Sequence, residues 1–233
     1  MPEQQGLTVN PADYGRWRRS RLGSLTERLE QEAVLRLSGS LAGRRVLDLG
    51  CGDGSYALLA DKEGAFAVGL DISSGMLRAA RGRAGAEAMR VIWCQASIDA
   101  IPFASDFFDI VVAVAVLCLS DDADAAVKEA ARVLRPGGLL IIGELGKFSW
   151  WSLWRTVRGY LGSARWRHAR FWSSRQLRRL VVEAGLAFDS SRGVIYYPPI
   201  AGMARIMVRY EERMSVFGQI GAAFLTVRAQ KPG

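Results

Sequence analysis

Apolar and polar residues follow one another along this chain in blocks that predict alternating strands and helices. Five apolar runs predict buried strands at 46–49, 66–70, 91–95, 108–112 and 139–144. Helical periodicity predicts helices at 24–41, 55–62, 76–80 and 121–134. The fourth apolar run continues without polar alternation, as expected for a strand that is buried on both faces of a parallel sheet. The pattern therefore predicts an α/β fold.

Two regions lie outside this alternation. The first 43 residues form a predicted helical arm, in which Tyr14 and Trp17 stand among arginines and Gly23 is expected to break the segment. After the fifth strand, an apolar stripe at helical spacing consists of Trp150, Leu153, Trp154, Val157 and Leu161. We expect most of this stripe to pack on the sheet, with an acceptor pocket or a membrane surface as the alternatives.

The pattern in the last third of the chain predicts two more helices and two more strands. A helix is expected through Leu177 and Ala184 up to the stop at Gly185, and another from Ile200 onwards. Two strands are expected, at 194–197 and 221–228.

The first strand runs into a glycine loop whose spacing indicates its ligand. Gly50, Gly52 and Gly54 form G-x-G-x-G, which differs from the G-x-G-x-x-G of dinucleotide sites. Asp48 and Asp53 add carboxylates, which would repel a pyrophosphate and suit a cationic ligand. A strand, a glycine loop and a helix in succession predict a nucleotide-type site with a positively charged ligand.

The second strand ends at Asp71, about twenty residues after the glycines. Rossmann-like sites place an acid there to accept hydrogen bonds from ribose hydroxyls. Ile72 is expected against one face of an adenine. Ser97 follows the third strand, and its hydroxyl can accept a hydrogen bond, although a weaker one than a carboxylate accepts.

Several motifs in this order resemble class I S-adenosylmethionine-dependent methyltransferases. They are the glycine loop, the run 69–73 with Met76, and the run 132–138, which reads R-V-L-R-P-G-G. The resemblance covers about residues 14–144 and is closest to the small-molecule group that includes ubiquinone and menaquinone enzymes. It implies a Rossmann-like, mostly parallel sheet of seven strands with the last strand antiparallel, helices on both faces and an inserted helical cap.

The resemblance also implies one domain over 1–233 with four parts. These parts are an arm at 1–43, a cofactor-binding core at 44–145, a cap over the substrate pocket at 146–173 and a C-terminal part at 174–233. It implies S-adenosylmethionine as cofactor and no metal. The implied cofactor-binding residues are Tyr14, Asp48, Gly50, Cys51, Gly52, Gly54, Asp71, Ile72, Met76, Ser97, Ile98 and Ala113.

Composition and charge indicate the cellular compartment in which the protein is expected. The net charge is +8, and residues 147–213 hold thirteen Lys or Arg against four Asp or Glu. The three cysteines have no metal-ligand or disulfide spacing, so we expect a reducing cytoplasm. The polar first ten residues predict no signal peptide, and the longest apolar run, at 110–119, is too short to span a bilayer as a helix.

Methyl transfer to a small, largely apolar acceptor is the predicted function. A basic, Trp-rich cap also suits a peripheral contact with an anionic membrane. His168 and Glu144 are the candidate bases, with Tyr14, Tyr196 and Tyr197 as weaker ones, and the sequence does not choose among them. An RNA-modifying methyltransferase that uses the basic cap and a non-catalytic cofactor-binding protein are the alternatives, and we expect nucleic acid to be the minority case.

Overall fold

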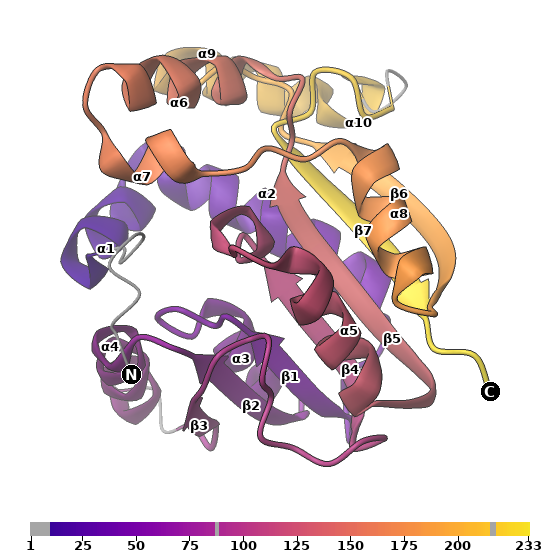
Figure 1. Cartoon of the computed structure of the whole chain (residues 1–233). Coiled ribbons are helices and arrows are strands. Elements are labelled where there is room, and N and C mark those ends of the chain that lie inside the picture. Colours follow the sequence, from indigo (N-terminus) through magenta and orange to yellow (C-terminus); the bar gives the residue numbers. More distant parts are fainter. Residues whose placement is uncertain (1–9, 87–88, 215–217) are drawn as a thin grey trace.

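A computed structural model describes residues 10–86, 89–214 and 218–233 (Figure 1). The seven strands are β1 (Arg45–Leu49), β2 (Phe66–Asp71), β3 (Ile92–Gln95), β4 (Phe108–Val114), β5 (Leu134–Leu145), β6 (Ala187–Val194) and β7 (Phe224–Gln230). They form one sheet in the order β3-β2-β1-β4-β5-β7-β6, and β7 is antiparallel to both of its neighbours. The predicted fold class is confirmed, including the antiparallel last strand.

The helices surround this sheet. They are α1 (Pro11–Arg19), α2 (Arg21–Ser38), α3 (Ser55–Lys62), α4 (Ser74–Ala86), α5 (Ala123–Val133), α6 (Trp150–Tyr160), α7 (Ala164–His168), α8 (Ser174–Glu183), α9 (Ala201–Met207) and α10 (Glu211–Met214). Two short 3₁₀ turns, η1 (Leu117–Leu119) and η2 (Val208–Tyr210), complete them. No helix in the described ranges is long and apolar enough to cross a membrane.

Two buried apolar clusters hold the layers together, one on each face of the sheet. On one face, α5 and α8 pack through residues such as Val127 and Leu180. On the other, α2, α3 and α9 contribute Val34, Ala60 and Ala204. Burial of apolar area of this kind is the main favourable term in folding, and it fixes the carboxyl ends of the parallel strands at one edge of the sheet.

The arm differs from its prediction at Gly23. This glycine does not break the segment, because it lies in the first turn of α2, which is capped by the Ser20 side chain. A Cβ at Gly23 would lie 2.0 Å from the Trp17 carbonyl oxygen, so the glycine permits the close approach of α1 and α2.

The strand predicted at 194–197 is also displaced. The chain leaves the sheet after Val194, because Ile195 adopts a left-handed φ of 66°. Residues 195–197 are buried by packing, which explains why their apolar pattern resembled a strand. The last strand begins at Phe224, three residues later than predicted.

Candidate functional site

A cavity of about 330 Å³ lies at the carboxyl ends of the parallel strands, between the sheet and the arm. From the arm and α3 it is lined by Tyr14, Glu27, Glu30, Ser55 and Tyr56. From the loops after the strands it is lined by Asp48, residues 50–53, 71–73, 97–99, 114–116 and 119–122, together with Met76. Most of the predicted cofactor-binding residues therefore meet in one place.

The three glycines of the loop have different roles. A Cβ at Gly50 would lie 2.2 Å from Val116, and one at Gly54 would lie 2.4 Å from the Trp93 ring, so both glycines serve packing. Gly52 has a left-handed φ of 54°, and a Cβ there would have no atom of the described residues within 4 Å. Because Gly52 lines the cavity, this open space is available for a ligand to approach the backbone.

Asp71 is held by the backbone at the predicted position. Its two carboxylate oxygens accept 2.8 Å hydrogen bonds from the N–H groups of Gly52 and Ser73. Each oxygen keeps a further lone pair, and the residue lines the cavity beside the half-exposed Ile72. This arrangement can accept hydrogen bonds from a diol and place an aromatic base against Ile72.

The two acids near the glycines have separate roles. Asp48 lines the cavity, its Oδ2 accepts from the Ala57 N–H at 2.8 Å, and burial raises its pKa to about 7. A bound cation would favour the charged form of this carboxyl. Asp53 instead forms ion pairs with Arg18 of α1 at 2.8 Å and Arg83 of α4 at 3.1 Å. Its charge is neutralised within the protein, and it fastens the arm to the glycine loop.

The loop after β4 lines the cavity in place of the predicted Ala113. Ala113 lies in the sheet core, and among the described residues it is 114–116 that line the cavity. Ala115 has a left-handed φ of 50°, which is uncommon for a residue with a Cβ and often marks a functional site. Ser97 and Ile98 line the cavity as predicted, in the connection between β3 and β4.

Glu144 does not fit its predicted role as a base. It is fully buried outside the described cavity wall, and its Oε1 accepts from the N–H groups of Val116 at 3.0 Å and Leu117 at 2.7 Å. Burial raises its pKa to about 7. Glu144 is thus a positioning residue that holds the strained turn after β4. Cys118 is buried beside it, as expected for a core residue.

His168 lies away from the cavity, and its role as a base stays a prediction. It is exposed at the end of α7, and it does not belong to the described lining of the cavity. No described residue of the predicted cap, 146–173, lines this cavity, so the role of that segment over a substrate pocket stays a prediction. The arm covers the site instead.

Sequence reasoning missed Glu27, Glu30 and Tyr56. Glu27 accepts hydrogen bonds from Ser55 at 2.9 Å and Arg18 at 3.4 Å. One turn later, Glu30 makes no hydrogen bond or ion pair within the described chain, and burial raises its pKa to about 8. The Tyr56 hydroxyl is buried without a partner there as well.

A signal for these residues was present in the sequence. Glu30 lies four residues from Thr26 and from Val34, which are both buried on the inner face of α2.

Residues 47–142 match the model of a family described as a methyltransferase domain. An uncharacterised protein of Mycobacterium tuberculosis is 30% identical over 230 residues, which cover 98% of this chain and 75% of that relative. An O-methyltransferase of Aspergillus sclerotiorum is 37% identical over 123 residues, 52% of this chain and 46% of the relative.

Solved structures share the fold. A S-adenosylmethionine-dependent methyltransferase of Thermotoga maritima, described as a possible histamine N-methyltransferase, superimposes with a TM-score of 0.72 at 23% identity over 94% of this chain and 95% of its own. Magnesium protoporphyrin IX methyltransferase of Synechocystis, solved with bound S-adenosylhomocysteine, gives 0.68 at 18% identity over 95% of each chain.

Proposed function

The chain belongs to the S-adenosylmethionine-dependent methyltransferases of the methyltransferase-domain family, and we propose that it methylates a small, largely apolar acceptor. This proposal rests on the cavity of about 330 Å³, which is lined both by the predicted cofactor-binding residues and by residues of the arm. Arg18 and Asp53 tie the arm to the glycine loop at 2.8 Å. A cavity that is covered by the arm in this way suits a small ligand that is enclosed by the protein.

The residues present fit the cofactor. Gly52 leaves open space at the cavity wall, Asp71 offers lone pairs for ribose hydroxyls, and Ile72 offers an apolar face for adenine. Asp48 suits the cationic amino group, because a positive charge nearby would offset the cost of its burial. When bound, S-adenosylmethionine supplies a methyl group that is already activated by a positively charged sulfur.

This chain's residues then have to hold the acceptor in line and remove its proton. Positioning and the exclusion of water are the larger part of that task. Glu30 is our candidate proton acceptor, since it lines the cavity without a hydrogen bond or ion pair among the described residues. Burial raises its pKa and the charge of Arg155 lowers it, and the resulting value of about 8 lies near neutral pH. The buried Tyr56 hydroxyl offers a hydrogen bond on the same side of the cavity.

RNA is the less favoured acceptor. The basic cap does not border the cavity in the described structure. Several of its arginines stack on aromatic rings, with Arg155 between Trp151 and Trp166 and Arg158 over Trp154. A phosphate track would need exposed charges along a groove that leads to the site.

The proposal is tested by incubating the full chain with methyl-labelled cofactor and fractionated cell extract. Label should enter the organic-soluble small-molecule fraction, and nuclease treatment should not remove it. Label that appears only in RNA would overturn the choice of acceptor. Cofactor binding by calorimetry without label transfer to any fraction would favour the non-catalytic alternative.

A further inference from the structure

The helix α6 has its apolar side facing solvent. Trp150, Leu153, Val157 and Leu161 are 63%, 56%, 47% and 80% exposed, and Trp154 is 40% exposed. These are the five residues of the stripe that was expected to pack on the sheet. The expectation is wrong for this helix, because its stripe points outward.

The inward side of α6 explains this orientation. Trp151 is buried and its Nε1 donates to the Tyr197 carbonyl oxygen at 2.8 Å. Arg155, which is 7% exposed, has its guanidinium 4.9 Å from the ring centres of both Trp151 and Trp166. A Cβ at Gly159 would lie 3.0 Å from the Trp166 backbone, so the glycine lets α7 pack closely there. The helix therefore cannot turn its stripe inward without losing these contacts.

A second apolar surface lies at the same end of the molecule. Figure 1 shows both α6 and α9 at the top of the view, and Trp151 and Ala204 from these helices belong to one buried cluster. Ile200, Met203 and Ile206 are 54%, 45% and 64% exposed. We call the exposed side chains of 150, 153, 154, 157, 161, 200, 203 and 206 the α6–α9 face.

The charged residues of α6, α7 and α9 are all basic. Residues 146–182 contain no Asp or Glu and nine Lys or Arg, and residues 190–210 contain no acid and three Arg. Arg158 lies over the Trp154 ring at 4.9 Å, and Arg205 and Arg209 are exposed beside the α9 stripe. The apolar centre is thus bordered by cations.

We propose that the α6–α9 face docks on an anionic lipid bilayer. Trp and aliphatic side chains enter the boundary between headgroups and acyl chains, while bordering arginines reach the lipid phosphates. A second copy of this chain is a poorer occupant, because a symmetric contact would bring the same positive border against itself. RNA would match the charge but leave the aliphatic residues Leu153, Val157 and Ile206 without a partner.

Co-sedimentation of the full chain with vesicles tests this proposal. We expect binding to phosphatidylcholine vesicles that contain about one third phosphatidylglycerol, and much weaker binding to phosphatidylcholine alone. A residual component should persist at about 1 M salt, because apolar insertion is not screened.

Two sets of variants separate the contributions. Trp150→Ser/Leu153→Ser/Val157→Ser should weaken binding more than about tenfold at every salt concentration, since three exposed apolar groups no longer insert. Arg205→Gln/Arg209→Gln should weaken it by about fivefold per arginine at low salt only. Cofactor affinity by calorimetry should stay unchanged in both, because neither set touches the cavity.

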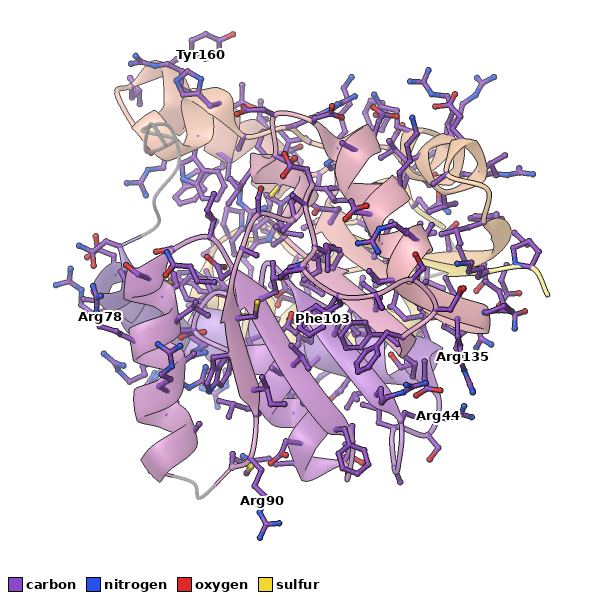
Figure 2. All side chains as sticks on the ribbon, turned by 60° about the horizontal axis from the view of Figure 1, so that its bottom comes forward. Arg44, Arg78, Arg90, Phe103, Arg135 and Tyr160 are labelled. Carbon is purple, nitrogen blue, oxygen red and sulfur yellow. The ribbon has the colours of Figure 1, made fainter. Side chains whose placement is uncertain are left out.

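The matched control is Phe66→Ser/Ile92→Ser, which removes two side chains that are 72% and 64% exposed. Figure 2 shows Arg90, two residues before Ile92, at the opposite end of the molecule from Tyr160 of α6. This control should bind vesicles like the unaltered chain. Three results would overturn the proposal. They are an equal loss of binding in the control, no vesicle binding by the unaltered chain, and a dimer in ultracentrifugation that the triple substitution dissociates.

Discussion

Replacing Asp71 by Ala tests the cofactor site most directly. In the folded protein the carboxylate accepts from two backbone N–H groups, those of Gly52 and Ser73, each at 2.8 Å. The substitution therefore removes the acceptor that we propose for the ribose hydroxyls, and it also frees the N–H groups of Gly52 and Ser73. The first consequence is measured as a loss of cofactor affinity, and the second as a loss of folding stability.

The expected loss of affinity follows from the hydrogen bonds to a charged group. Such bonds contribute about 1.5–3 kcal/mol, which corresponds to roughly 10- to 150-fold in the dissociation constant of S-adenosylmethionine. The loss of stability should be about 1–3 kcal/mol if the freed N–H groups stay partly shielded from water. Calorimetric titration and thermal unfolding of the same sample measure the two quantities.

Asp109→Ala is the matched control. Asp109 is another strand carboxylate, buried where Asp71 is partly exposed, and its Oδ2 accepts from the Arg45 N–H at 2.7 Å at the end of the sheet away from the cavity. It should lower stability and leave cofactor affinity unchanged. If Asp71→Ala behaves in the same way, with lower stability and unaltered affinity, the assignment of Asp71 to the ribose is refuted.

Three further substitutions probe the site. Gly52→Val should abolish cofactor binding by calorimetry, because Val fills the open space at Gly52 and strains its left-handed backbone, and circular dichroism checks that the protein is still folded. Glu30→Gln should lower label transfer by about 10²–10⁴-fold and flatten the pH dependence of the melting temperature. A carboxyl with a pKa raised to about 8 keeps its proton on folding, so its contribution to stability is lost as the pH rises towards 8. Glu144→Gln should leave transfer within about tenfold, since an amide oxygen can still accept from Val116 and Leu117, whereas loss of a base would cost more.

The parallel part of the sheet could be predicted because its signals are local. Each strand from β1 to β4 is a short apolar run that ends at a turn, and the prediction was correct to within a few residues. At the C-terminal edge, β6 is a half-exposed strand that pairs only with β7, so its residues carry little apolar pattern. The buried residues after it gave the stronger and misleading signal.

The cofactor side of the cavity was predictable for a related reason. The glycine spacing, Asp71 and Met76 belong to single strand–loop–helix units, so their positions relative to one another follow from the sequence. Glu30 and Tyr56 reach the cavity from different elements, and only the docking of the arm brings them together. The ion pair of Arg18 with Asp53 links the arm to the glycine loop, and no local pattern reveals it.

The cap shows what an amphipathic pattern does and does not determine. The spacing of Trp150, Leu153, Trp154, Val157 and Leu161 specifies a helix with one apolar side, but it does not specify what that side contacts. The neighbours of the helix decide this. Here an indole–guanidinium–indole stack through Arg155 and the hydrogen bond of Trp151 occupy the inner side. The contacts of the buried Arg155 therefore indicate the outward orientation of the stripe better than the stripe's own periodicity does. Arg155→Ala should destabilise the protein and loosen the packing of α6, although it leaves the exposed residues themselves unchanged.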